Sequence, residues 1–104
     1  MEAYKNDIRR VLENKEWREY LDKVKKEHGL TDKEAMIFTA LNVFAYNYGE
    51  GDALGGLALI GAVRNDEVLD VIEKVLGKRI KSYVGLFIEL HRTEGYKIIR
   101  KILH

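Results

Sequence analysis

The sequence predicts an all-α protein, a compact bundle of five to six short helices. Proline is absent from the 104 residues, so proline interrupts no helix interior. Apolar residues recur every three or four positions over most of the chain, which is the period of an amphipathic helix. Residues that favour helix ends, among them Asn, Asp, Thr and Gly, separate these periodic segments. The length and the globular composition suit a single domain spanning residues 1–104.

Two helices are expected before residue 30. The apolar face of residues 2–13 moves to the opposite side of the helix after Asn14. One straight helix cannot bury both faces in one core, so we expect a break at Asn14, which caps a second helix over 15–28. Gly29 is a favourable residue for the end of that helix. The apolar residues are Tyr4, Ile8, Val11 and Leu12 before the break and Trp17, Tyr20, Leu21 and Val24 after it.

The next helix, over residues 32–48, is apolar on nearly all sides, as is typical of a buried helix. Thr31 and Glu34 have the spacing of a capping box at its start. A narrow polar stripe interrupts the apolar surface and contains Thr39, Asn42 and Tyr46. We interpret Asn42 and Tyr46 as a candidate contact patch for a partner.

Residues 53–63 are all small or apolar and follow Asp52, a candidate cap. The segment is too short to span a bilayer. Gly56 and Gly61 have the spacing of a phosphate loop, but the Lys and Ser or Thr that such a loop requires do not follow Gly61. The segment therefore predicts a buried helix whose small residues let another backbone approach closely. These small residues are Gly55, Ala58 and Ala62.

A short amphipathic helix is expected over 66–76, with Asn65 or Asp66 as its cap and Gly77 at its end. The apolar segment that follows is typical of either a strand or a buried helix, but regularly spaced polar residues favour a helix over 83–92. A basic amphipathic helix is expected over 96–103.

A β-hairpin turning at "HRTEG", residues 91–95, is the alternative for this last part of the chain. In the helical interpretation, helices 32–48, 53–63 and 83–92 form the interior. Helices 15–28, 66–76 and 96–103 then cover that interior.

The segments "LTDKEAMIFTAL", "ALGGLALIGAV" and "NDEVLDVIEKVL" lie within residues 30–76. Together they resemble the three helices of winged-helix regulators of the archaeal TrmB and MarR kind. The resemblance implies a tri-helical, helix-turn-helix-like core in which helix 66–76 reads the DNA major groove. That helix presents acidic residues, which phosphates repel, whereas base reading uses Arg, Lys, Asn or Gln. The acids are Asp66, Glu67, Asp70 and Glu73.

Charge is unevenly distributed along the chain. Residues 31–73 contain two Lys or Arg against eight Asp or Glu, and residues 74–104 contain eight against two. Basic clusters neutralise phosphates, so the leading prediction is a binding module, regulator-like or part of a nucleoprotein complex, that contacts nucleic acid through this basic third. The predicted contacts are Lys74, Lys78, Arg79, Lys81, Arg92, Lys97, Arg100 and Lys101.

The alternative is a protein-interaction or self-assembly subunit. In that case the acidic 31–73 face of one copy would meet the basic 74–104 face of another, or of a protein partner. A homo-oligomer or a protein partner is therefore expected alongside nucleic acid.

Enzyme chemistry is not predicted. The chain has no cysteine and a single serine, Ser82, so few residues are suited to nucleophilic catalysis. No histidine has the spacing of a metal motif, and we expect no cofactor and no metal. No signal peptide and no membrane association are expected, which favours the cytoplasm. The absence of Gln and Cys, together with abundant charge, resembles a thermophile composition.

Overall fold

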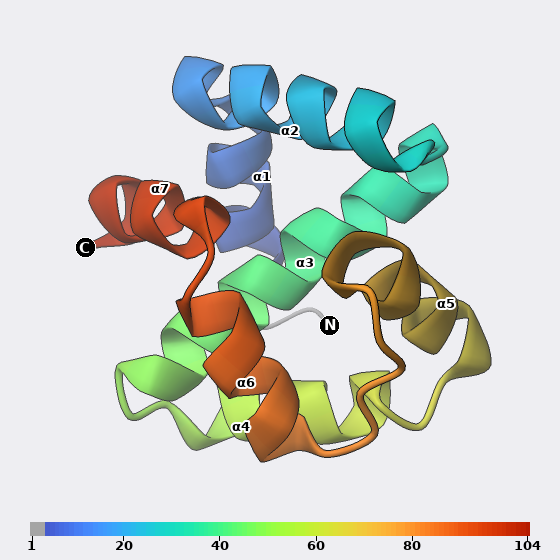
Figure 1. Ribbon diagram of the computed structural model, residues 1–104. Helices are drawn as coiled ribbons and strands as arrows, with labels where there is room; N and C mark the ends of the chain where they lie inside the picture. The colour runs from blue at the N-terminus through green and yellow to red at the C-terminus, as the bar shows by residue number, and fades with distance from the viewer. Residues whose placement is uncertain (1–3) are drawn as a thin grey trace.

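Seven helices and no strand make up residues 4–104, the part of the chain that the computed structural model describes (Figure 1). The predicted all-α class is confirmed, with more helices than the five to six expected because every predicted break between helices is present. The helices are α1 (Lys5–Glu13), α2 (Lys15–His28), α3 (Asp32–Gly49), α4 (Ala53–Ala62), α5 (Asp66–Leu76), α6 (Tyr83–His91) and α7 (Glu94–Leu103). Residues 2 and 3, predicted to begin the first helix, lie outside the described residues.

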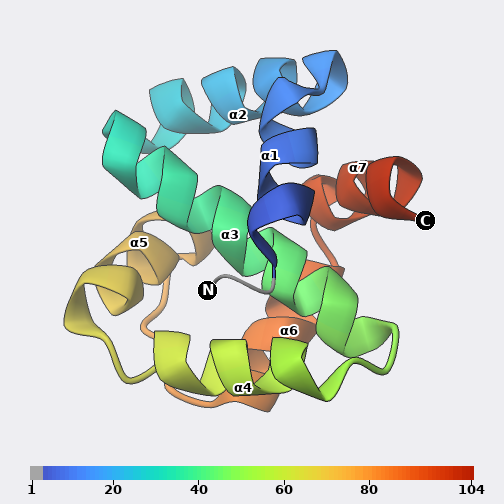
Figure 2. The ribbon, with the colours of Figure 1, turned by 180° about the vertical axis from the view of Figure 1, so that it is seen from behind.

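Helix α3 runs through the middle of the molecule, and the other six helices surround it (Figures 1 and 2). Helices α1 and α2 lie at one end and α4 and α6 at the other, while α5 and α7 lie on opposite sides. The core contains side chains from all seven helices, and Phe38, Leu59 and Ile99 are among the most deeply buried. The predicted burial of α3 is therefore confirmed.

The helix ends follow the local signals in the sequence. The Asn14 side chain accepts a hydrogen bond from the Trp17 backbone N–H at 3.0 Å, which separates α1 from α2. Thr31 and Glu34 form the predicted capping box, with reciprocal bonds of 3.1 and 3.0 Å. Gly29 ends α2 at φ 65°, a left-handed conformation that glycine adopts without strain. Asp52, Asn65, Ser82 and Thr93 cap α4 to α7.

Helices α3 and α4 approach each other closely at Gly55. A Cβ atom on this residue would lie 2.5 Å from the backbone nitrogen of Tyr48 and 2.8 Å from the backbone oxygen of Phe44. Both distances are shorter than real Cβ contacts, so only glycine allows this separation of the two backbones. The predicted close approach of another backbone is confirmed at this position.

The prediction that residues 53–63 and 83–92 are interior is only half right. One side of each helix packs on the core, with Leu59 of α4 and Leu86 of α6 fully buried. The other side faces solvent, because the six helices around α3 form its outer layer and nothing among residues 4–104 lies outside them. The exposed large apolar residues here are Leu54, Leu57, Val84 and Ile88.

The β-hairpin alternative for residues 80–103 is wrong, since two helices occupy this segment. Helix α7 begins at Glu94, two residues earlier than predicted, because the Thr93 hydroxyl accepts a hydrogen bond from the backbone N–H of Tyr96. Gly95 therefore lies inside α7 rather than in a turn. It is buried, and a Cβ there would lie 3.0 Å from the Tyr20 ring. Close packing between α7 and α2 explains the glycine.

The polar stripe of α3 faces the core rather than solvent. The indole N–H of Trp17 donates to the Thr39 hydroxyl at 3.1 Å, and that hydroxyl donates to the Ala35 carbonyl. The Asn42 side-chain amide donates to the Phe38 carbonyl at 2.9 Å. These bonds satisfy most of the polar groups that the crossing of α2 and α7 over α3 removes from water, but the Asn42 side-chain oxygen has no hydrogen-bond partner among the described residues.

The predicted contact patch at Asn42 and Tyr46 is therefore wrong for this structure. Asn42 is fully buried and Tyr46 is 6% exposed, so neither side chain is available to a partner. The Tyr46 ring packs against Tyr96 of α7, with ring centroids 6.2 Å apart. The neighbouring helices cover the stripe. Helical periodicity in the sequence does not predict where those helices lie.

Candidate nucleic-acid interface

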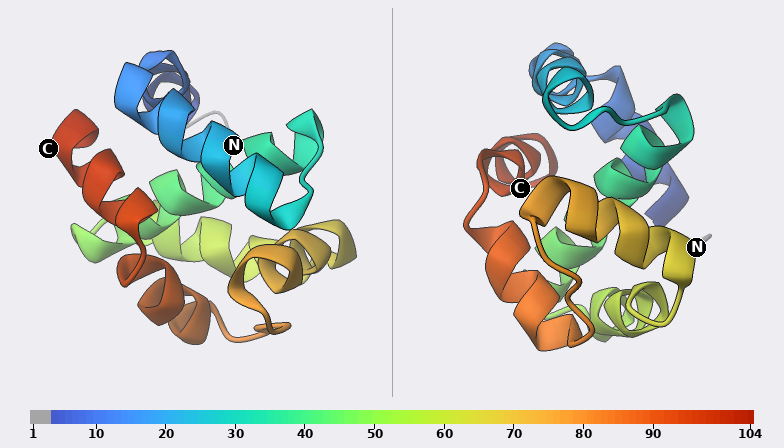
Figure 3. Two further views of the ribbon diagram at one scale, coloured as in Figure 1. Left: turned by 45° about the horizontal axis from the view of Figure 1, so that its top comes forward. Right: turned by 45° about the vertical axis from the view of Figure 1, so that its right-hand side comes forward.

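The eight predicted basic contacts form two groups on opposite sides of the molecule. One group lies at the end of α5 and in the segment leading to α6, and the other lies before and along α7 (Figures 1 and 3). The first group contains Lys74, Lys78, Arg79 and Lys81, and the second contains Arg92, Lys97, Arg100 and Lys101. The basic third of the sequence is thus not one continuous surface.

Acidic side chains neutralise most of the first group. Lys74 contacts Glu34 of α3 at 2.6 Å, and Lys78 contacts Glu89 of α6 at 3.3 Å. The hydrogen bond from Lys74 holds the pKa of the Glu34 carboxyl below its usual range, and the bond from the Thr31 backbone lowers it further. These cations therefore have acidic partners within the chain itself.

Arg79 binds the acidic face of α5. Its guanidinium lies 2.6 Å from Asp70, 3.3 Å from Glu73 and 3.6 Å from Asp66. The hydrogen bond to Asp70 raises the pKa of Arg79, and the bond to Glu73 adds to this effect. The acidic surface of α5 is therefore partly occupied by a cation from the chain itself.

Three members of the second group, Lys97, Arg100 and Lys101, share one face of α7. Ile98 and Ile99 of this helix are buried in the core, so its opposite side faces solvent. Lys97, Arg100, Lys101 and His104 recur along that side at the three- and four-residue spacing of a helix and are exposed. We call these four residues the α7 basic face. They border an open hollow of about 700 Å³.

Part of the α7 basic face has acidic neighbours. Lys101 contacts Glu16 of α2 at 2.8 Å, and His104 lies 3.8 Å from Glu50. Within residues 4–104, no ion pair engages Lys97, Arg100 or the nearby Arg92. These three cations are therefore available to an anion from outside the chain.

Arg10 extends the basic character of this region from a different part of the sequence. Its guanidinium donates a 3.0 Å hydrogen bond to the backbone carbonyl of Ile102, in the last turn of α7. A cation at this position is favoured by the partial negative charge of the helix end. Arg10 is not among the basic contacts predicted from the sequence. No local pattern relates it to α7, because the contact joins residues 92 positions apart.

Two buried tyrosines lie beneath this region. Burial raises the pKa of Tyr46 and of Tyr96, the charge of Glu50 raises both further, and the charge of Arg100 opposes the increase. Both phenols therefore stay neutral around pH 7 and take part in packing. The positive charge of the region comes from the exposed side chains alone.

Comparisons of the chain with protein-family models, with curated proteins and with solved structures found no match. No group of three or more His, Asp or Glu side chains in residues 4–104 is placed to hold a metal ion. None of the helices described here combines the length and the hydropathy needed to cross a membrane.

Proposed function

We propose that this protein is a small, non-enzymatic, cytoplasmic binding module that associates with nucleic acid through the α7 basic face. The observation that carries the proposal is the run of Lys97, Arg100, Lys101 and His104 along one exposed side of a helix. Exposed cations gathered on one face neutralise phosphates and release the counterions bound to them. Such contacts position a protein on nucleic acid without reading base sequence.

The proposal places the contact on α7 rather than at the end of α5. Lys74, Lys78 and Arg79 already have carboxylate partners, so binding a phosphate would require breaking an internal ion pair. Binding a phosphate at Lys97 or Arg100 would break no ion pair among the described residues. The tri-helical winged-helix resemblance of α3 to α5 is retained as a proposal about shape, with the nucleic-acid contact moved to α7.

Assembly through complementary acidic and basic faces is supported less well. That alternative requires the charges of residues 31–73 and 74–104 to pair between copies. Several of them instead pair within one copy, as in Lys74 with Glu34 and Arg79 with Asp70. The charge that remains for a partner is concentrated on α7.

Neutralising the α7 basic face is expected to weaken nucleic-acid binding and its salt dependence together. In the variant Lys97→Gln/Arg100→Gln/Lys101→Gln, the slope of log affinity against log salt should become less steep by about two to three, because about one counterion is released per phosphate contact and Lys101 already pairs with Glu16. Fluorescence anisotropy of labelled DNA and RNA oligonucleotides over a salt series measures this slope.

The matched control is Lys74→Gln/Lys78→Gln/Arg79→Gln, which changes the net charge equally on the other side of the molecule. We expect this control to keep nearly the slope of the unaltered protein. Equal decreases of affinity and salt slope in the two variants would show a nonspecific charge effect and contradict the assignment to α7. Absence of binding to either oligonucleotide at low salt would refute the proposed function.

A further inference from the structure

The solvent-facing side of α4 is apolar along its whole length. Residues 53–62 contain no charged side chain, and Leu54 and Leu57 are 45% and 60% exposed. Ala53 and Gly61 are also exposed on this side. We call Ala53, Leu54, Leu57 and Gly61 the α4 apolar face. Surface helices normally place polar residues on the solvent side, so an apolar one indicates a contact surface.

This face continues into an apolar groove of about 360 Å³ between α3, α4 and α5. Leu57 and Gly61 border the groove from α4, and Ile37 and Phe44 border it from α3. A partner that packs on α4 thus gains additional apolar surface beside it. The groove alone does not indicate which partner binds. The shape and the charges of α4 indicate it.

The α4 apolar face has complementary features. The Leu54 side chain protrudes from it, and Gly61, which has no side chain, leaves a notch in it. Leu54 and Gly61 lie seven residues apart, close to two helical turns, and so share one side of the helix. Apart from its chain neighbours and the backbone of its own helix, no heavy atom of the described chain lies within 4 Å of the position that a Cβ on Gly61 would take. If two copies of α4 pack antiparallel about a two-fold axis near Leu57, Leu54 of each copy covers Gly61 of the other. Parallel packing would instead set the two leucines against each other.

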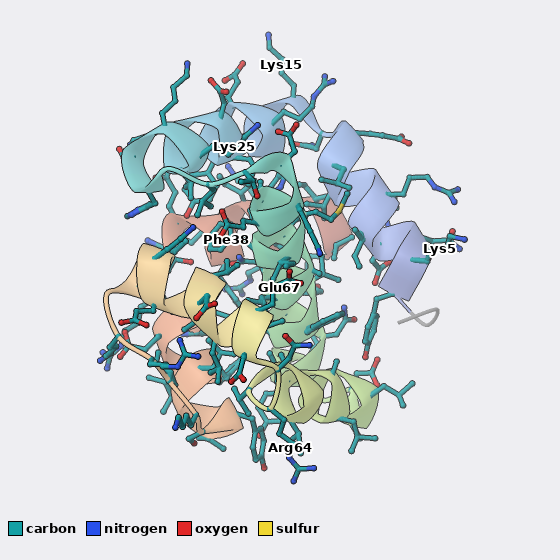
Figure 4. The ribbon with its side chains drawn as sticks, turned by 90° about the vertical axis from the view of Figure 1, so that its right-hand side faces the viewer. Lys5, Lys15, Lys25, Phe38, Arg64 and Glu67 are labelled. Carbon is teal, nitrogen blue, oxygen red and sulfur yellow. The ribbon has the colours of Figure 1, made fainter. Side chains whose placement is uncertain are left out.

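The charges at the ends of α4 favour the same arrangement. Glu50 and Asp52 precede the helix, and Arg64 follows it, exposed at the outer edge of the molecule (Figure 4). Glu50 is exposed and lies 3.8 Å from His104, and Asp52 accepts a 2.8 Å hydrogen bond from the Tyr4 hydroxyl. Antiparallel packing brings Arg64 of one copy to the acidic end of α4 in the other, twice in a symmetric dimer. The opposed helix dipoles add to this complementarity. The uncharged middle of the face gives no repulsion between copies.

From these observations we infer that the protein forms a two-fold symmetric dimer through antiparallel packing of the α4 apolar face against the same face of a second copy. The inference does not rest on the proposed nucleic-acid binding, because it is argued from α4 and its flanking residues, whereas the binding is assigned to α7 (Figure 1). Lys97, Arg100 and Lys101 are not part of the proposed dimer contact.

The first test is the mass of the full chain by sedimentation equilibrium over a range of concentrations. The unaltered protein is expected to approach twice its monomer mass, and Leu57→Glu is expected to be a monomer. Ile88→Glu, the same change at an exposed apolar residue of α6, should keep the dimer. Helical circular dichroism and Trp17 fluorescence check that each variant is folded. A monomeric unaltered protein, a dimeric Leu57→Glu or a monomeric Ile88→Glu would overturn the assignment to α4.

Cysteine cross-linking tests the orientation, since the chain contains no cysteine of its own. Under mild oxidation, an equal mixture of Leu54→Cys and Gly61→Cys should form a disulfide-linked dimer of the two variants, while each variant alone should form far less. Leu57→Cys should cross-link with itself, because it lies beside the proposed axis. Preferential linkage of Leu54→Cys to itself would indicate parallel packing and overturn the inference.

Discussion

The variant Asn42→Asp is expected to lose about 4 kcal/mol of the free energy of unfolding at neutral pH. Asn42 is fully buried in α3, and its side-chain oxygen has no hydrogen-bond partner. An ionised carboxylate in its place would have no cation beside it and would lose the hydrogen bond that the amide donates to Phe38. An uncompensated buried charge is among the most destabilising changes in a protein core.

The loss of stability in Asn42→Asp is expected to increase as pH rises. Burial disfavours the charged form, so the pKa of the new carboxyl in the folded state lies above the value of about 4 for an unfolded Asp. The protonated acid can donate to the Phe38 carbonyl as the amide does. The difference in stability from the unaltered protein should therefore be small below the unfolded pKa and grow as pH rises toward the folded pKa.

Urea unfolding monitored by the fluorescence of Trp17, the single tryptophan, measures both effects over a pH series. Asn65→Asp is the matched control. Asn65 is exposed and caps α5, a position where Asp serves as well as Asn, so this change should have little effect. A deficit in Asn42→Asp that stays constant with pH would show that lost packing, and not buried charge, causes the destabilisation.

Gly55→Ala is expected to reduce the free energy of unfolding by about 3 kcal/mol. The added methyl group would meet the backbone of α3 at Tyr48 and Phe44, and a backbone cannot move aside as a flexible side chain does. Helices α3 and α4 would have to separate, which exposes part of the core between them. Urea unfolding at a concentration that keeps the chain monomeric measures the change without any contribution from association.

Gly61→Ala makes the same substitution six residues later on the same helix. Here the added methyl group meets nothing in the described chain, and alanine favours a helix over glycine by about 0.8 kcal/mol. We therefore expect a small increase in stability. Opposite signs for the two variants would locate the close contact at Gly55, whereas equal effects would mean that helix propensity alone controls both.

Much of the fold could be predicted from the sequence, because helix ends depend on nearby residues. Asn14, Thr31 and Gly29 act through hydrogen bonds or backbone conformations within a few positions of themselves. The start of α7 was missed because the role of Gly95 is not local. Gly95 is typical of a turn in sequence terms, and only the packing of Tyr20 against it explains a glycine inside the helix.

The candidate sites could be predicted only in part. The alternation of basic and apolar residues after Gly95 predicted the α7 basic face, since one helix contains all of its members. The pairing of Arg79 with Asp70 and the contact of Arg10 with Ile102 depend on how separate segments meet. The sequence did not predict the apolar face of α4. An apolar helix has the same sequence pattern whether other helices cover it on all sides or leave one side exposed to solvent.

The sequence by itself thus determined the all-α class, the positions of the helix boundaries to within a few residues, and the basic side of α7. These features arise from interactions between residues that are close along the chain. Only the tertiary structure decided that Asn42 is buried, that half of the predicted cations have internal partners, and that Leu54 and Leu57 face solvent. Each of these depends on which surfaces of distant helices meet, and helical periodicity does not specify that choice.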